Sequence, residues 1–381
     1  MHLIYIYTHI YKMHILISDY HTGCQLWQAA LLEKLGNNIV INSLSGHSFL
    51  IDANKKQNIT VDANKILDVH NIQPLLSELD KVNVKSFDTV LVSFPPKFID
   101  LYKNVKLKYP KILNAGHRLH IHTKHDKFFI KSLIEQINNK EIILCSMSKY
   151  DTEYIKHYLN ITPIELYVTC FHIPEHISYK PIRNEILISP VHASSFAPFK
   201  SILDMNQIAK DMGFNLVFSD IRSLYDYFKY EDLVNHKATV LFPYSAFSIS
   251  MIEIYEMNIP MFVPSKKLLI ETGIMNDISL FPCYSSYEEM IEIDIPHTNS
   301  PHKYSPNSMK NEDRLYWLDF TYFNTKENVI FWDNPTDLFN KLISTNLQLV
   351  SDKMKIENMK HREKQLNNWK NLLESFNSLG G

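Results

Sequence analysis

Short apolar segments alternate with longer segments of helical periodicity along most of the chain. In the first half, segments rich in Ile, Val, Leu and Phe cover 14–19, 38–44, 88–94, 111–116 and 141–148. After the first of these, apolar residues recur at helical spacing from Leu26 to Leu35, and Gly36 ends the pattern. Buried strands that alternate with helices are typical of a parallel sheet covered by helices. The first half is therefore predicted to be a Rossmann-like α/β domain.

The second half repeats this alternation after an irregular connection. Residues 163–184 contain three prolines and no helical period, which is typical of a crossing between domains. The predicted strands that follow are 185–191, 215–220, 238–245 and 259–265, with a helix near 199–212. Two α/β domains are thus expected, which suits a chain of 381 residues, because that length exceeds what one hydrophobic core usually serves.

The end of the chain carries a long helical pattern. Leu366, Trp369, Leu373 and Phe376 lie at helical spacing, so this helix is expected to pack back on the N-terminal domain. The expected division is an N-terminal domain, a C-terminal domain and this helix, with bounds 1–172, 173–350 and 351–381. Residues 295–313 are polar and contain proline, and they are predicted to be a surface loop or partly disordered.

Composition narrows the class of protein. A hydrophobic fraction of 45% and a charged fraction of 21% are ordinary for a globular protein, and a net charge of -2 gives no electrostatic reason to expect nucleic-acid or membrane-surface binding. The four cysteines form no CxxC pair, which indicates reduced thiols in a cytoplasmic compartment. No transmembrane segment is evident, and residues 1–12 are either an extra strand or an upstream extension.

An acidic residue, Glu253, stands among apolar neighbours in the segment FPYSAFSISMIEIYEMNIPMFVPS, residues 242–265. A helix is predicted over 250–258, and Ser245, Ser248 and Ser250 stand near its start. Unpaired N–H groups at a helix N-terminus bind phosphate well, so these serines are candidates for a phosphate site. Glu253 has two interpretations: with Ser250 it forms an S-x-x-E capping box, or its carboxylate binds a ligand.

The two halves, the crossing and this segment resemble GT-B fold glycosyltransferases, with support from CSMSKYDTEYIKHYL at 145–159. The chain also looks similar to uncharacterised glycosyltransferase-like proteins of large DNA viruses and algae. The resemblance implies two Rossmann-like domains facing a cleft, with the acceptor in the first (1–172) and the nucleotide sugar in the second (173–350). It also implies transfer of a sugar from a UDP- or GDP-sugar to a glycan or protein acceptor, without a bound metal. In many members two glutamates flank this turn, and the later one, matched by Glu253, holds the ribose. The earlier position falls within 244–248 and has no acid.

Further donor-site candidates follow predicted strands. His192 and Lys200 lie where the first strand of the second half gives way to a helix, and a diphosphate favours a cation there. Arg222 follows the next strand and is a candidate for the base or the phosphates. In the first half, Gly23 stands beside His21 at a strand-to-helix turn, where the backbone can approach a ligand closely. The segment 22–25 also reads as a capping box, so an ordinary helix start is the alternative.

Histidines crowd the segment NAGHRLHIHTKHD, residues 114–126. Their spacing matches neither an H-E-x-x-H helix nor a Cys/His finger, so metal binding is the minority interpretation. His117 and Arg118 follow a predicted strand where it would reach the cleft. They are the catalytic candidates, with roles in orienting the acceptor or stabilising the leaving group.

Two other functions remain compatible with the sequence. A nucleotide-sugar 2-epimerase can share this architecture but needs several carboxylates in its site, and the strand ends of the first half offer chiefly Asp19. A non-catalytic nucleotide or sugar binder on the same scaffold is the other alternative, which the missing first glutamate favours.

Overall fold

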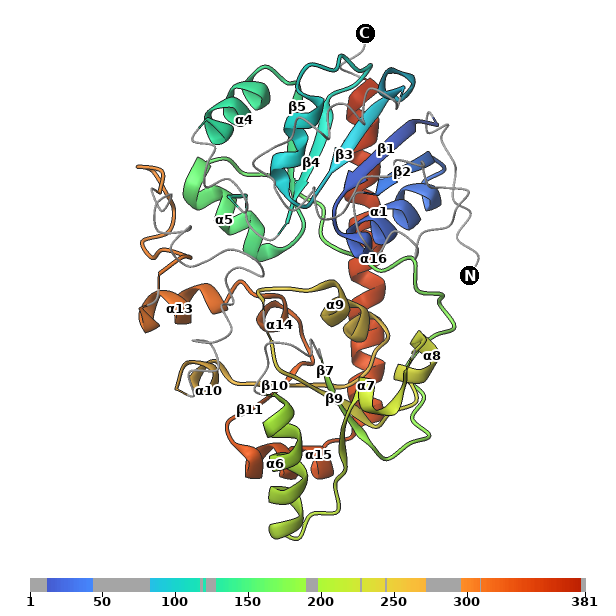
Figure 1. Cartoon of the computed structure of the whole chain (residues 1–381), viewed down its shortest axis with the longest axis vertical. Helices are drawn as coiled ribbons and strands as arrows, with labels where there is room; N and C mark the ends of the chain where they lie inside the picture. Colours follow the sequence, from blue (N-terminus) through green and yellow to red (C-terminus); the bar gives the residue numbers. More distant parts are fainter. Residues whose placement is uncertain are drawn as a thin grey trace. The chain divides into compact units, whose positions relative to one another are not determined.

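The computed structural model describes residues 12–43, 83–116, 119–120, 128–189, 198–226, 228–243, 245–271, 296–308 and 310–377 (Figure 1). It divides into two compact units. Unit 1 comprises Met1–His172, Ser285–Pro301 and Glu363–Gly381, and unit 2 comprises Ile173–Tyr284 and His302–Arg362. Each unit is built on one parallel sheet, so the predicted α/β fold with two Rossmann-like sheets is confirmed.

Unit 1 contains a six-stranded sheet in the order β2-β1-β3-β4-β5-β6, and every pair in it is parallel. The strands are β1 (His14–Asp19), β2 (Asn38–Ser43), β3 (Thr89–Val92), β4 (Lys111–Ala115), β5 (Ile142–Ser146) and β6 (Ile164–Glu165). Its described helices before residue 172 are α1 (Thr22–Lys34), η2 (Val84–Ser86), η3 (Pro96–Tyr102), α4 (Phe129–Asn138) and α5 (Lys149–Leu159).

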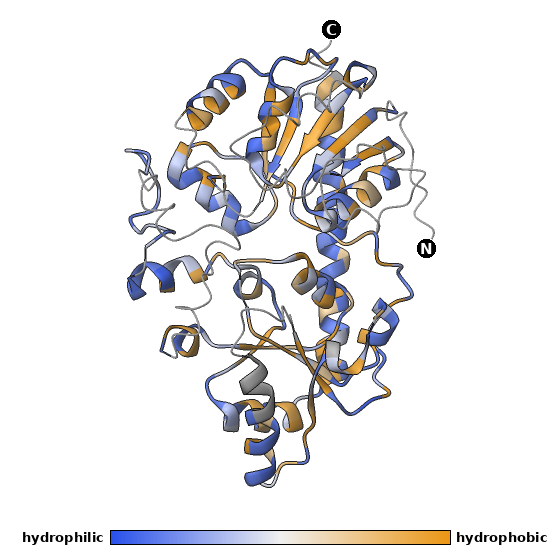
Figure 2. Cartoon of the chain, viewed as in Figure 1, coloured by the Kyte–Doolittle hydropathy of each residue, from blue (hydrophilic) through white to orange (hydrophobic). Residues whose placement is uncertain are grey.

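Local sequence explains where the helices of unit 1 begin and end. Gly36 has φ 85°, a left-handed conformation that glycine adopts without strain, and α1 ends just before it. Ser148 is the N-cap of α5, and its Oγ accepts the Asp151 N–H at 3.1 Å. The strands themselves are hydrophobic along their length, as Figure 2 shows, because helices cover both faces of such a sheet.

Unit 2 contains a five-stranded parallel sheet in the order β11-β10-β9-β7-β8. Its strands are β7 (Ile186–Ser189), β8 (Phe218–Asp220), β9 (Ala238–Leu241), β10 (Met261–Pro264) and β11 (Ile330–Trp332). The helices around them are α6 (Pro198–Asp211), α7 (Ile221–Leu224), α8 (Tyr230–Leu233), α9 (Ile249–Glu256), α10 (Lys266–Glu271), α13 (Asn311–Leu318), α14 (Tyr322–Thr325) and α15 (Pro335–Ser344).

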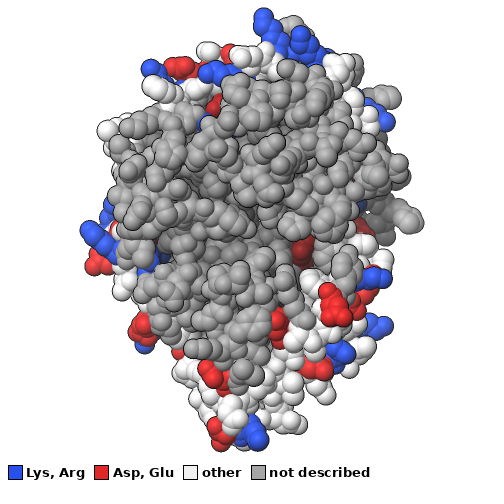
Figure 3. Space-filling model, viewed as in Figure 1, with Lys and Arg blue, Asp and Glu red and all other residues white. Residues whose placement is uncertain are grey.

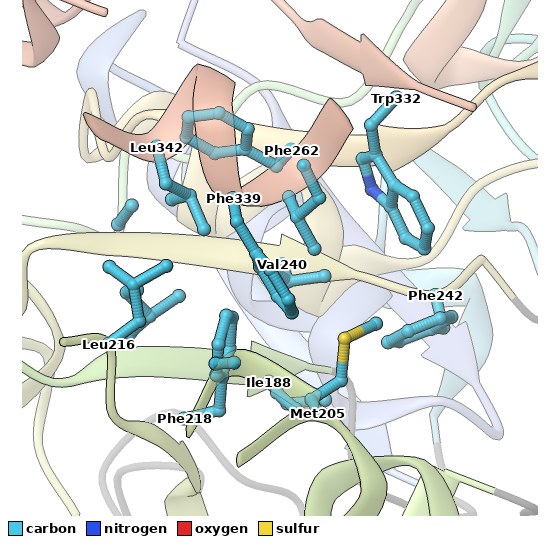
Figure 4. Packing of buried hydrophobic residues seen from close by; sticks show 14 residues of the cluster. Ile188, Met205, Leu216, Phe218, Val240, Phe242, Phe262, Trp332, Phe339 and Leu342 are labelled. Atoms are coloured by element: carbon cyan, nitrogen blue, oxygen red, sulfur yellow. The ribbon is translucent and has the colours of Figure 1, made fainter. Parts of the chain in front are cut away.

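The core of unit 2 lies between its sheet and helices α6 and α15 (Figure 4). Phe339 of α15 is fully buried, and its ring centroid lies 5.4 Å from that of Phe214 and 5.7 Å from that of Phe218. Trp332 of β11 packs edge-on against Phe242, with 5.9 Å between the ring centroids. These aromatic contacts fix the carboxyl end of β9, from which the chain leads to α9.

The long helix α16 (Leu347–Asn377) contributes to both units, with 347–362 in unit 2 and the remainder in unit 1. In unit 1 its Trp369 is fully buried against Trp27 of α1, with 6.4 Å between ring centroids. Gln365 accepts the Tyr167 N–H at 2.9 Å through its Oε1. The apolar positions that predicted this helix therefore form part of the unit 1 core.

The expected surface loop at 295–313 is in part a packed segment. The His297 N–H donates to the His157 carbonyl at 3.0 Å, and Ser300 Oγ lies 2.8 Å from His157 Nδ1, so this segment is fastened to α5. His302 is buried, with its Nδ1 2.7 Å from the Tyr316 hydroxyl. Residues 296–308 contain no helix or strand, so they form the expected loop, and hydrogen bonds pack part of this loop against the rest of the chain.

Candidate functional site

The N-terminus of α9 follows β9 through residues 242–248. Ser248 is its N-cap, with extended backbone angles (φ -142°, ψ 153°), and Ser248 Oγ accepts the Met251 N–H at 3.3 Å. The interpretation of Ser250 and Glu253 as a capping box is therefore wrong. The helix begins earlier than predicted because Ile249 is buried and already belongs to it.

Only one narrow face of α9 reaches solvent. Six of its eight residues are buried, and Ser250 and Glu253, three positions apart on one face, are the two that are partly exposed. Ser250 Oγ lies 3.2 Å from Ser248 Oγ, so the polar stripe continues to the N-cap. Glu253 is therefore not buried in the core, although its apolar sequence neighbours are. Those neighbours point to the other faces of the helix.

Tyr230, the first residue of α8, contacts the Glu253 carboxylate. Its hydroxyl donates a hydrogen bond to Glu253 Oε1 at 2.8 Å. A phenol hydrogen bond of this kind restricts the rotation of the carboxylate and fixes the direction of its remaining lone pairs. Tyr230 was not identified from the sequence, because it lies 23 residues from Glu253 in another helix.

Ser245 lies in the turn before α9 and is buried. Its hydroxyl donates to the Phe247 carbonyl at 2.5 Å, so its hydrogen stabilises the turn itself. Of the three serines expected at the start of the helix, Ser248 and Ser250 stand there and Ser245 does not. Its part in binding a donor stays a prediction.

In unit 1, Gly23 lies in the first turn of α1, and His21 is the N-cap. No side chain caps this helix, so the interpretation of 22–25 as a capping box is wrong. The His21 ring packs edge-on against Phe94, with 6.3 Å between centroids. The loop after β1 and the loop after β3 are therefore neighbours at the carboxyl end of the sheet.

The carboxylate of Asp19, at the end of β1, is fully buried between these loops. Oδ1 accepts the His21 N–H at 2.7 Å, and Oδ2 accepts the Phe94 N–H at 3.0 Å. Burial raises the pKa of Asp19 to about 7, against the effect of hydrogen bonds from His21, Phe94 and Ser93, which lower it. From the sequence, Asp19 was recognised only as an acid at the end of a strand. Its contact with Phe94 was not predictable, because the two residues lie 75 positions apart in the chain.

The remaining candidates lie wholly or partly outside the described residues. This holds for His117, Arg118 and His192 entirely. Lys200 and Arg222 lie on the described backbones of α6 and α7, and their side chains fall outside the description. Their proposed roles stay predictions.

The described residues also show the surface charge, the possible metal ligands and the state of the cysteines. The surface in Figure 3 shows acidic and basic side chains together on the described portions of this face, as a net charge of -2 suggests. Among the described residues, no group of three or more His, Cys, Asp or Glu is arranged to hold a metal ion. Cys24, Cys145 and Cys170 are buried free thiols, and Cys283 lies outside the description. No helix in the described ranges is long and apolar enough to cross a bilayer.

Comparison with known proteins gives structural likeness at very low sequence identity. No family model matches the chain, and no curated protein matches it. The calicheamicin glycosyltransferase CalG4 aligns over 96% of this chain and 98% of its own, with 9% identity and a TM-score of 0.48. The spinosyn forosaminyltransferase SpnP aligns over 95% and 100%, with 9% identity and a TM-score of 0.47. The spinosyn rhamnosyltransferase SpnG, complexed with thymidine diphosphate, aligns over 91% and 96%, with 10% identity and a TM-score of 0.42.

Proposed function

We propose that the chain is a glycosyltransferase that takes a sugar from a nucleotide-activated donor, with the nucleotide bound at the carboxyl end of the unit 2 sheet. The observation that carries this proposal is the single polar stripe of α9. Ser250 and Glu253 are the two partly exposed residues of an otherwise buried helix. The stripe begins at the helix N-terminus and ends at a carboxylate one turn further on.

Each part of this stripe suits one part of a nucleoside diphosphate. The first N–H groups of a helix lack intrahelical partners, and the helix dipole favours an anion there, so the diphosphate is assigned to the Ser248 end. Glu253 accepts hydrogen bonds from the two hydroxyls of a ribose, with Tyr230 holding the carboxylate in place. UDP- and GDP-sugars both meet these requirements.

Transfer also requires a group that takes the proton of the acceptor hydroxyl. We assign the acceptor, a glycan or a protein, to unit 1, with His117 and Arg118 as the catalytic candidates from the sequence. His21 is a third candidate, because it lies at the carboxyl end of β1 and an imidazole is suited to proton transfer near neutral pH. Arg118 would stabilise the charge that develops on the leaving diphosphate.

Incubation with labelled UDP- and GDP-sugars and a panel of glycan and protein acceptors tests this function. Label on an acceptor supports a glycosyltransferase. Conversion of the free nucleotide sugar into its 2-epimer would support the epimerase instead. Saturable nucleotide binding without turnover would support a binding protein, and no binding of any nucleotide would remove the donor site from α9.

Replacing Glu253 by alanine is expected to weaken nucleotide binding by roughly ten- to a hundredfold, since each lost hydrogen bond to a charged group costs about 1.5–3 kcal/mol. The free energy of unfolding should change by less than about 1 kcal/mol, because Glu253 is partly exposed and does not cap the helix. Calorimetry with UDP and GDP and urea unfolding of the same variant measure the two effects.

Tyr230→Phe is the matched control for this experiment. It removes the hydroxyl that contacts Glu253 and leaves the carboxylate in place. We expect a smaller loss of affinity, about three- to tenfold, because the carboxylate keeps its charge and loses only its orientation. If Glu253→Ala instead lowered stability and left affinity unchanged, Glu253 would be a structural residue and the ribose assignment would be wrong.

A further inference from the structure

The Asp19 carboxylate connects two loops that follow neighbouring strands of unit 1. Besides the His21 and Phe94 N–H groups, it accepts hydrogen bonds from the backbone and hydroxyl of Ser93. The Tyr20 N–H also donates to the Phe94 carbonyl at 3.0 Å, so the loops are joined in both directions. One side chain therefore determines how the loop after β1 meets the loop after β3.

Two glutamines of α1 donate hydrogen bonds to Asp19 and Ser93 and so hold the two loops in place. Gln28 Nε2 donates to Ser93 Oγ at 2.5 Å, and Gln25 Nε2 donates to the Asp19 carbonyl at 2.6 Å. Both glutamines, Ser93 and Asp19 are fully buried. Burying a carboxylate is costly, and a packed apolar residue would usually give the core more stability. The cost points to a role in the geometry of the loops.

We propose that Asp19 is a positioning residue, whose ionised carboxylate holds His21 and Gly23 against the loop after β3 at the carboxyl end of the unit 1 sheet, where the acceptor binds. The acceptor part of this statement rests on the proposed function. The loop contacts themselves stand on the geometry alone. Asp19 has no exposed surface and takes no direct part in the reaction.

The charge of Asp19 changes near neutral pH, where its pKa of about 7 lies. A protonated carboxyl has one oxygen that carries hydrogen, and that oxygen cannot accept as fully from the loop N–H groups. The titratable groups around Asp19 are His21, the N-cap of α1, Cys24 in the first turn of α1, and Asp151 of α5. In addition to burial, the charge of Asp151 raises the pKa of Cys24. Burial keeps the pKa of Cys24 well above its usual value, so Cys24 stays neutral in this range.

Loop order and overall stability should consequently change in opposite directions. Because the folded-state pKa lies above the value of 3.8 for a free carboxyl, the folded protein binds the proton more tightly. The stabilisation from this proton is complete below about pH 4 and is lost as pH rises through about 7, so the unfolding equilibrium constant rises about tenfold per pH unit between these values. The loops follow the opposite trend because their local opening breaks these hydrogen bonds while Asp19 stays buried, and the ionised carboxylate loses more from this than the protonated carboxyl does.

Hydrogen exchange of the full chain between pH 5.5 and 8.5 tests the proposal, with rates corrected for intrinsic chemistry. In the wild type, amides of peptides covering 18–25 and 92–98 should gain about tenfold protection as pH rises through 7. In Asp19→Asn their protection should be low and independent of pH, because an amide offers only one acceptor oxygen. Peptides from β9 and α9 provide the unchanged reference. Loops with pH-independent protection in the wild type, or full protection in Asp19→Asn, would overturn the proposal.

Kinetics separate a positioning role from a purely structural one. Asp19→Asn should lower kcat/KM for the acceptor about tenfold or more, while UDP or GDP affinity by calorimetry is unchanged. Unaltered acceptor kinetics alongside loosened loops would make Asp19 merely structural. If the wild type transfers no sugar, the proposed function fails, and the exchange experiment still decides whether Asp19 holds the loops. Should Asp19→Asn fail to fold, the pH series of the wild type decides the same question.

Discussion

Trp369→Ala should lower the free energy of unfolding of unit 1 by about 3–5 kcal/mol, the cost of removing a large aromatic side chain from a packed core. Trp369 is fully buried and lies edge-on against Trp27, which is fully buried as well. Truncation leaves a cavity between α16 and α1 that no small local shift can fill, because both helices are held by other contacts. The Asn368 side chain, for example, donates to the Glu165 carbonyl at 2.8 Å.

Urea unfolding followed by hydrogen exchange of separate peptides measures this loss. Peptides from β1 and β4 report on unit 1, and peptides from β9 and β10 report on unit 2, which avoids assuming one transition for both units. Asn367→Ala is the control, since Asn367 is exposed on the same helix and should change stability by less than about 0.5 kcal/mol. A loss below about 1 kcal/mol for Trp369→Ala would show that this end of α16 is not part of the core.

Arg362→Ala is expected to destabilise unit 2 by about 3 kcal/mol. Arg362 Nε lies 3.0 Å from Glu256 Oε2, and only 1% of the Glu256 side chain is exposed. Without the guanidinium, a carboxylate of α9 stays in the protein interior without this cation, and breaking one side of a buried ion pair is costly. Loss of the contact should also loosen the C-terminal end of α9, the helix to which the donor nucleotide is assigned.

A double-mutant cycle with Glu256→Gln isolates this interaction. The cycle consists of Arg362→Met, Glu256→Gln and the double variant. The double variant should lose much less stability than the sum of the two single losses, because the pair is then replaced by groups without charge. Peptide-resolved exchange in urea again assigns the change to unit 2. A loss in the double variant equal to the sum of the two single losses would show that the two side chains do not act as a pair.

Regular elements were predictable because their signals are local. The segment 14–19 matches β1, and the helical pattern that ends at Gly36 matches α1, because apolar periodicity and a glycine after the last turn act within a few residues. The partial exposure of Glu253 was not predicted from its apolar sequence neighbours. Its immediate neighbours in the sequence are apolar, but each residue of a helix is rotated by about 100° from the one before, so these neighbours lie on other faces of α9. Within α9, Ser250 is the residue that shares the partly exposed face with Glu253.

The parts of the site that escaped prediction depend on contacts between distant segments. Among three serines in 245–250, the sequence offers no way to choose Ser248 as the cap, because the choice follows from the burial of Ile249. The contacts of Tyr230 with Glu253 and of Phe94 with Asp19 join residues that are 23 and 75 positions apart. Such pairs follow from the packing of whole elements, so a single sequence does not reveal them.

The division of α16 between the units has a consequence for synthesis on the ribosome. Unit 1 combines Met1–His172 with Glu363–Gly381, and the second of these segments begins about 190 residues after His172. At 5–20 residues per second, that segment emerges on the order of ten seconds or more after the first sheet is made. Until then the apolar surface around Trp27 lacks its cover, whereas unit 2 is complete as soon as Arg362 has emerged. The unit that is translated first is therefore the last to finish folding, and its nascent form is the one that most needs a chaperone.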